Sequence, residues 1–174
     1  IYDECAYEGN LQMSWGNITG FEMASRFWCA IASGAYCTHG EVFLDEKDVL
    51  WWAKGGILKG ESPKRIAYLR EFVKELPGPL VNWDVSFMNE IPADNPFAIF
   101  MSGLPEVLKD ANRLKDGEYA GRYQDQVFMR YFAHNCMGEF EMKLPEQGSY
   151  RIDVIVIWEM TRETIKAAVK GKVK

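Results

Sequence analysis

A Pro77-Gly78-Pro79 run divides this chain into two stretches with different hydrophobic periodicity. Proline removes a backbone donor and glycine has no side chain, so this run ends any regular element that reaches it. Before the run, apolar residues recur with a helical repeat, and after it they alternate with polar residues. The sequence therefore predicts two domains with different folds, residues 1–78 and residues 79–174.

The stretch before the break shows the pattern of two amphipathic helices joined to short strands. Thr19 and Glu22 form a capping box, and apolar residues recur four apart beyond it, which predicts a helix over residues 20–33. Ser62 is expected to cap a second helix over residues 63–76. A strand–helix–strand–helix order is typical of a parallel α/β fold. The expected strands are residues 1–4 and 35–38, with Gly34 ending the first helix and Pro63 in the first turn of the second.

The stretch after the break is predicted to be a small antiparallel β-domain of sandwich type. Residues 139–144 alternate strictly with a period of two, as expected for a strand with one buried face. Further apolar runs bounded by turn residues predict additional strands. The four expected strands are residues 97–101, 127–133, 139–144 and 150–160.

Composition excludes several classes of function. Of the 174 residues, 48% are hydrophobic and 26% charged, which suits a folded chain, and the net charge of -5 argues against a nucleic-acid partner. No apolar run reaches the roughly 18 residues that span a membrane. The four cysteines show no CxxC spacing, so we expect reduced, mostly buried thiols and a cytoplasmic protein. The chain opens on Ile1 without a signal peptide or an initiator Met, and it is expected to be a fragment of a longer protein.

Three carboxylates are concentrated at the end of the first expected strand and just beyond it. Asp3, Glu4 and Glu8 lie within six residues, beside an aromatic ring and a glycine. The carboxyl ends of parallel strands are where catalytic groups gather in such folds, and a carboxylate there can act as a nucleophile or a general acid. The alternative is a solvated acidic loop without a chemical role.

A second polar group follows the second expected strand. His39 and Glu41 are placed to face one pocket, although a hydrogen-bonded structural histidine explains the pattern equally well. Neither of the two histidines has a partner at zinc-ligand spacing, so we predict no metal and no other cofactor.

Two tryptophans are candidates for stacking against a sugar ring. Trp52 lies in an expected loop over residues 50–62, next to a Gly-Gly pair, and Trp15 lies in the loop before the first helix. An exposed aromatic ring in a pocket is a common platform for a ligand's apolar face. Each ring could instead anchor its own loop.

The order of these motifs resembles the apiosidase-like glycoside hydrolases, which belong to the clan A (β/α)8-barrel enzymes. The resemblance over residues 1–76 is specific, and residues 150–161 are similar to the β-domain that follows the barrel in that group. The motifs are Asp3-Glu4-Cys5-Ala6-Tyr7-Glu8-Gly9-Asn10, Trp15-Gly16-Asn17-Ile18-Thr19, Arg26-Phe27-Trp28, Gly34-Ala35-Tyr36, Thr38-His39-Gly40-Glu41, Leu50-Trp51-Trp52 and Gly60-Glu61-Ser62-Pro63.

The resemblance implies that this chain holds the last two βα units of a barrel, followed by the β-domain. It makes Glu4 the expected nucleophile of a retaining glycosidase and Glu8 the rival for that role. An oligosaccharide or glycoside substrate is then expected to contact His39, Glu41, Trp15 and Trp52. Glu8 is expected to contact it too if Glu8 is not the nucleophile.

The acid/base residue of that group lies on an earlier strand, which this chain lacks. The rest of the barrel is therefore expected in the parent chain or in a partner chain, and this chain by itself is expected to be inactive. The alternatives are a non-catalytic carbohydrate-binding or structural β-module, or an interaction domain.

Overall fold

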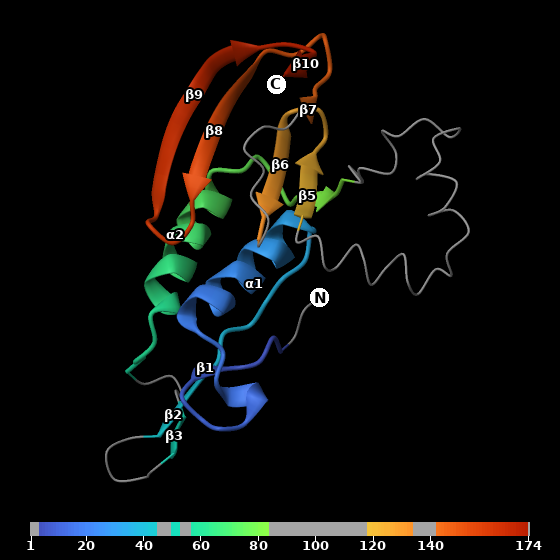
Figure 1. Ribbon diagram of the computed structural model, residues 1–174. Helices are drawn as coiled ribbons and strands as arrows, with labels where there is room; N and C mark the ends of the chain where they lie inside the picture. Colours follow the sequence, from blue (N-terminus) through green and yellow to red (C-terminus); the bar gives the residue numbers. More distant parts are fainter. Residues whose placement is uncertain (1–3, 45–49, 53–56, 84–117, 134–141, 174) are drawn as a thin grey trace, which may run out of the picture.

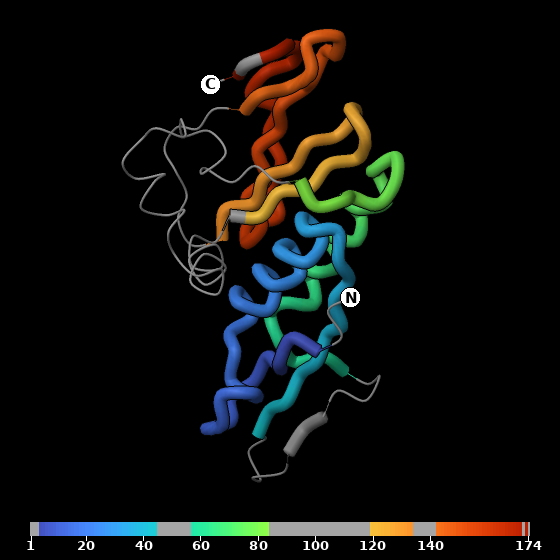
Figure 2. Tube along the Cα trace, turned by 90° about the vertical axis from the view of Figure 1, so that its right-hand side faces the viewer, coloured from blue at the N-terminus to red at the C-terminus, as the bar shows by residue number. Residues whose placement is uncertain are grey.

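The computed structural model describes residues 4–44, 50–52, 57–83, 118–133 and 142–173. Within these ranges the fold mixes two α-helices with four small sheets, most of whose strand pairs are antiparallel. The two helices lie side by side in the middle of the molecule, with β1 to β3 at one end and the β-hairpins at the other (Figures 1 and 2). Neither described helix is long and apolar enough to cross a bilayer.

The first helix, α1 (Gly20–Ala32), follows the sequence prediction closely. The Thr19 hydroxyl accepts a hydrogen bond from the Glu22 amide at 3.1 Å, as a capping residue should. Its apolar face is buried, with Met23 and Trp28 almost inaccessible to solvent. The helix ends before Gly34, whose φ of +74° is the left-handed conformation that glycine adopts without strain.

The second helix, α2 (Ser62–Lys74), begins at Ser62 itself, with Glu61 in the capping position. The predicted cap at Ser62 is therefore wrong, because the Ser62 hydroxyl is engaged by side chains from other segments. Pro63 lies in the first turn as predicted. The cap of α2 is a carboxylate contributed from elsewhere in the chain, as described below.

A three-stranded sheet lies beyond the helices. Strand β1 (Glu8–Gly9) runs parallel to β2 (Glu41–Leu44), and β3 (Leu50–Trp52) pairs antiparallel with β2; a short 3₁₀ helix, η1 (Ser14–Gly16), precedes α1.

Two predictions for this region need correction. Among residues 35–38 only Cys37 has a β-bridge, because the pairing with β1 begins at Glu41. Residues 50–52 are a strand and not loop, because they form a hairpin with β2.

The stretch after Pro79 forms antiparallel pairs, in agreement with the prediction. β4 (Val81–Asn82), β5 (Glu118–Tyr123) and β6 (Val127–Phe132) form one sheet, β7 (Met142–Lys143) pairs with β10 (Lys172–Val173), and β8 (Tyr150–Val156) pairs with β9 (Thr161–Val169).

The strand expected over 150–160 ends instead at Val156, and β9 was not expected. The apolar residues that follow Val156 form a turn that packs on α2, so they do not extend the strand. The strand expected at 97–101 lies outside the described residues, as does the first half of the one expected at 139–144.

One hydrophobic core runs across the predicted domain boundary. Trp28 of α1 stacks on Tyr131 of β6 with ring centroids 6.3 Å apart, and the Tyr131 hydroxyl donates to Ser25 Oγ at 2.9 Å. Arg65 of α2 lies 3.2 Å above the Trp158 ring and donates its Nε to the Trp158 carbonyl at 3.0 Å. The helices and the hairpins that follow them are therefore packed against each other through buried aromatic contacts.

Candidate functional site

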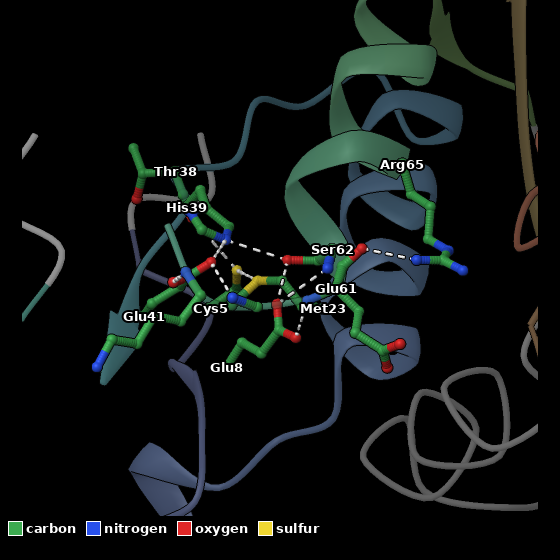
Figure 3. Close-up of polar contacts among 11 residues, drawn as sticks. Cys5, Glu8, Met23, Thr38, His39, Glu41, Glu61, Ser62 and Arg65 are labelled. Carbon is green, nitrogen blue, oxygen red and sulfur yellow. Dashed lines mark hydrogen bonds and ion pairs between the residues drawn. The ribbon is translucent and has the colours of Figure 1, made fainter. Parts of the chain in front are cut away.

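Two buried carboxylates stand opposite each other where β1 and β2 pair. Glu8 and Glu41 are partners in the parallel ladder, and these two residues are only 4% and 1% exposed to solvent. Burial of a charged group is costly unless hydrogen bonds replace its water. Both side chains point at the start of α2 (Figure 3).

The carboxylates bind four consecutive backbone N–H groups at that helix terminus. Glu8 accepts from the Glu61 amide at 2.6 Å and from the Ser62 amide at 3.1 Å. Glu41 accepts from the Lys59 amide at 2.7 Å and from the Gly60 amide at 3.1 Å. The first N–H groups of a helix have no partner within it and carry a partial positive charge, so an anion is favoured there. Glu8 thus serves as the missing cap of α2, and Glu41 binds the two residues that lead into it.

Glycine is required where the chain passes between these carboxylates. A Cβ atom at Gly60 would lie 2.3 Å from Glu8 Oε2 and 2.7 Å from Glu41 Oε1. Such distances are well inside van der Waals contact. The close approach of backbone to carboxylate explains why residue 60 carries no side chain.

His39 and Ser62 complete a hydrogen-bonded chain to Glu8. The Ser62 hydroxyl donates to Glu8 Oε2 at 2.5 Å, and His39 Nε2 lies 3.1 Å from the same hydroxyl oxygen. The Ser62 hydroxyl has one proton, which it uses in the hydrogen bond to Glu8. His39 Nε2 must therefore be the donor in the hydrogen bond between His39 and Ser62. Burial lowers the pKa of His39, and the nearby charges of Glu41 and Glu8 oppose that shift. His39 is therefore a neutral imidazole with its proton on Nε2 at neutral pH.

This cluster fixes residues 59–62 at the start of α2, and its polar groups are already engaged with one another and with the backbone. Ser62 is 0% exposed, so its hydroxyl cannot reach a ligand as a nucleophile. Glu8, His39 and Glu41 offer ligand atoms within 4.8 Å of one another, a spacing that a metal ion could use. Every oxygen of the two carboxylates already accepts a backbone N–H, however, and this arrangement favours a positioning role for the trio.

Glu4 differs from these buried carboxylates because it is exposed. A hydrogen bond to the Glu4 carboxylate raises the pKa of the Tyr7 phenol, with smaller contributions from burial and from the Glu4 charge. Tyr7 in turn meets the Trp15 ring edge-on, with centroids 5.8 Å apart, and Trp15 is 40% exposed. An accessible carboxylate, a phenol and an aromatic ring therefore follow one another along one side of this segment.

A residue in the left-handed backbone conformation separates the exposed Glu4 from the buried Glu8. Ala6 has a φ of +74°, which costs about 1 kcal/mol or more for a residue with a Cβ. In a regular strand, residues three apart point to opposite faces, yet Cys5 and Glu8 are both buried. The turn at Ala6 resets the alternation, so that the inward side of the segment holds Cys5 and Glu8.

Helix α1 holds the backbone next to Glu4. The Arg26 Nη1 donates to the Cys5 carbonyl at 2.6 Å, and its Nε donates to Glu22 at 2.8 Å. Arg26 thus connects the helix to the carbonyl group of the residue that follows Glu4. Neither Tyr7 nor Arg26 was identified as a site residue from the sequence, although both stand in the recognised motifs.

The structure places the site residues predicted from the sequence as follows. The structure brings together Glu8, His39 and Glu41, and it places Glu4 and Trp15 near Tyr7. Trp52 belongs to β3, where it pairs with Val42, and its side chain lies outside the described residues, as does Asp3.

Comparisons with known proteins address the fold. A family described as "Domain of unknown function (DUF5605)" matches residues 116–174. A crystal structure from Bacteroides vulgatus ATCC 8482, described as a "putative glycoside hydrolase", is similar with a TM-score of 0.61 and 24% identity. No match to a curated protein was found. The structural alignment covers 97% of this chain and 29% of the Bacteroides chain, so this chain shares its mixed helix-and-sheet fold with one part of a much longer protein.

Proposed function

We propose that this chain is the C-terminal part of a retaining glycoside hydrolase in which Glu4 is the nucleophile. The observation that carries this proposal is the environment of Glu4, an exposed carboxylate that is hydrogen-bonded to Tyr7 and begins the segment that leads into β1. A nucleophilic carboxylate must be accessible to the sugar and held in one orientation. The exposure of Glu4 and its hydrogen bond to Tyr7 support this role, whereas Glu8 is buried and occupied by the α2 terminus.

The fold supports a barrel assignment for residues 1–78. The segment after Glu4 and the segment after His39 run parallel in β1 and β2, with α1 between them in sequence. This is the βαβ unit from which (β/α)8 barrels are built. Glu4 lies just before β1 and His39 lies just before β2. We assign residues 79–174 to an appended antiparallel β-domain. The similarity to the Bacteroides structure, described as a "putative glycoside hydrolase", supports a relation to glycoside hydrolases.

Trp15 is the proposed platform for the sugar. An exposed indole can cover the apolar face of a pyranose, and Tyr7 fixes the orientation of this ring by its edge contact. Trp52 remains a candidate for a second platform. Glu8, His39 and Glu41 act as positioning residues, since they fix the loop over residues 59–62 beside the strand ends.

A complete retaining site needs a second carboxyl group about 5 Å from the nucleophile. In our proposal that acid/base residue belongs to the remainder of the barrel, in the parent chain or a partner chain. The substrates are oligosaccharides or glycosides from plant or other polysaccharides.

The test is covalent trapping in a protein that contains the complete barrel. A panel of 2-fluoro glycosyl fluorides should leave one glycosyl group on Glu4, because such sugars form the glycosyl-enzyme quickly and release it slowly. Peptide mass mapping identifies the modified residue. The Glu4→Gln variant should lose both labelling and turnover by at least 10³-fold while its unfolding curve is unchanged.

The matched control is Glu159→Gln, another exposed glutamate far along the chain. This variant should be labelled like the wild type. Labelling on Glu8, or near-normal turnover in Glu4→Gln, would contradict the nucleophile assignment.

The second candidate function is carbohydrate binding without catalysis. The exposed Trp15 ring favours it, because stacking needs no carboxylate. Under this reading Trp15→Ala abolishes sugar binding, Glu4→Gln does not alter it, and binding is nearly independent of pH. Hydrolysis controlled by two carboxyl groups gives a bell-shaped pH profile instead.

A further inference from the structure

Two thiols lie close together, and one of them belongs to Cys5, the residue that follows Glu4. Cys37 Sγ lies 3.2 Å from Cys5 Sγ, and Cys5 Sγ lies 3.7 Å from the Met23 sulfur. Cys5 is 3% exposed and Cys37 is half-buried, and the three cysteines in the described part of the chain are all free thiols. We infer that Cys5 and Cys37 are an oxidisable dithiol, whose disulfide links the segment that carries Glu4 to the segment that carries His39.

The geometry needs little movement to close this bond. A disulfide has sulfur atoms about 2.05 Å apart, so the two thiols must approach each other by roughly 1.2 Å. They lie on the same two neighbouring segments that pair at Glu8 and Glu41, a few residues further along. The two cysteines are 32 positions apart in sequence, so the bond would close a long loop.

In this proposal Cys5 supplies the thiolate. The hydrogen bond from Cys37 lowers the pKa of Cys5 to about 7, burial opposes this shift and the charge of Arg26 supports it. A thiolate is the reactive form of cysteine. Cys29 provides a contrast on α1, because burial raises its pKa to about 11.

A small peroxide is the proposed oxidant, since Cys5 is 3% exposed and Cys37 is half-buried, which disfavours a bulky oxidant. The Cys5 thiolate attacks one peroxide oxygen, the O–O bond breaks, and hydroxide leaves, which makes Cys5 a sulfenic acid. The Cys37 sulfur then attacks the Cys5 sulfur. The S–O bond breaks, and the hydroxyl leaves as water with the Cys37 proton. Overall, two thiols lose two electrons and two protons, and one hydrogen peroxide becomes two waters.

The consequence for catalysis rests on the proposed function. Closing the disulfide would move Cys5, the residue next to Glu4, toward Cys37. A misplacement of about 1 Å at a reacting group can cost on the order of 10²-fold in rate. Oxidation should therefore lower kcat at least tenfold in a protein with the complete barrel. A thiol reductant should restore kcat.

The first test needs no activity. The reduced full chain is titrated with hydrogen peroxide, unfolded, labelled with N-ethylmaleimide and mapped by peptide mass. Cys5 and Cys37 should lose labelling together and appear as one linked peptide, while Cys29 stays labelled. The oxidised chain should melt roughly 5–15 °C higher, and reductant should reverse the shift.

Two variants sharpen this test. Cys37→Ser should leave Cys5 without a disulfide, and Cys29→Ser, the matched control, should form the same linked peptide as the wild type. Should Cys37→Ser fail to fold, the wild-type map decides. Full labelling of both cysteines at peroxide concentrations that oxidise dithiothreitol overturns the inference, and so does a link from Cys5 to any other cysteine.

The catalytic test separates the two proposals. A disulfide that forms without any change in kcat overturns the regulatory part and leaves the modification standing. Absence of hydrolysis in the reduced complete protein contradicts the proposed function and does not affect the disulfide.

Discussion

Glu8 and Glu41 are paired residues of two parallel strands, and their carboxylates together bind four successive N–H groups at the start of α2. This arrangement fastens the β1–β2 sheet to the second helix. Because both side chains are buried, we expect each carboxylate to contribute substantially to the free energy of unfolding.

Glu41→Gln tests that contribution. A glutamine amide keeps the shape but replaces one acceptor oxygen with a donor that faces a backbone N–H. The free energy of unfolding should fall by about 2–4 kcal/mol, measured by urea denaturation. Glu163→Gln removes an exposed carboxylate of β9 and should leave stability unchanged. Equal stability of Glu41→Gln and the wild type would mean that the carboxylate does not hold residues 59 and 60 before α2.

The link between Ser62 and Glu8 can be measured by a double-mutant cycle. Ser62→Ala removes the hydroxyl that donates to Glu8 and leaves the His39 N–H without its acceptor, so we expect a loss of about 1–3 kcal/mol. Combined with Glu8→Gln, the losses should fall short of additivity by about 1 kcal/mol or more. Additive losses would show that the two side chains act independently.

His39 should make stability depend on pH. Burial lowers its pKa in the folded state, so the unfolded chain binds the proton more readily. Its contribution to stability is therefore present above the ordinary histidine pKa of about 6.5 and is lost as the pH falls from there toward the lower folded pKa.

His39→Gln supplies the comparison for that pH dependence. Glutamine retains an N–H donor for Ser62 but does not titrate. The fall in unfolding free energy between pH 7 and pH 5 should be smaller in this variant. A steeper fall than in the wild type would contradict the predicted direction of the His39 pKa shift.

Tyr7→Phe examines the neighbour of Glu4. The change removes the phenol that hydrogen-bonds the carboxylate and keeps the ring that contacts Trp15. In the proposed hydrolase kcat should fall by about tenfold or more, because one preorganised donor is lost. The control is Tyr36→Phe, which alters an exposed phenol. Similar kcat values for both variants would argue that Tyr7 does not orient Glu4.

Arg65→Lys tests the contact between α2 and the turn after β8. Lysine keeps the charge but loses the planar group over Trp158 and the separate donors to the Trp158 and Glu61 carbonyls. Residue 65 is 7% exposed, so we expect a loss of about 1–3 kcal/mol on thermal or urea unfolding. Arg70→Lys changes an exposed arginine on the same helix and should have no effect. Two separate unfolding transitions in Arg65→Lys would show that this contact couples the two parts of the chain.

Local chemistry determined the helices and the choice of reactive groups. The Thr19–Glu22 cap and the apolar repeat of α1 act within a few residues, so that helix could be predicted with its start. Glu4, His39 and Glu41 were visible in the sequence as candidate groups, but the strand expected to end before His39 was not found, and Glu41 begins β2.

Tertiary structure decided what each group does. The Ser62 hydroxyl looked like a helix cap because caps are local, but a carboxylate 54 positions away binds it and takes over that role. The left-handed turn at Ala6 overrides strand alternation, so which of Glu4 and Glu8 is buried could not be read from periodicity. The proximity of Cys5 to Cys37 likewise depends on the parallel pairing of distant segments. These outcomes follow from long-range contacts, which a periodic pattern does not encode.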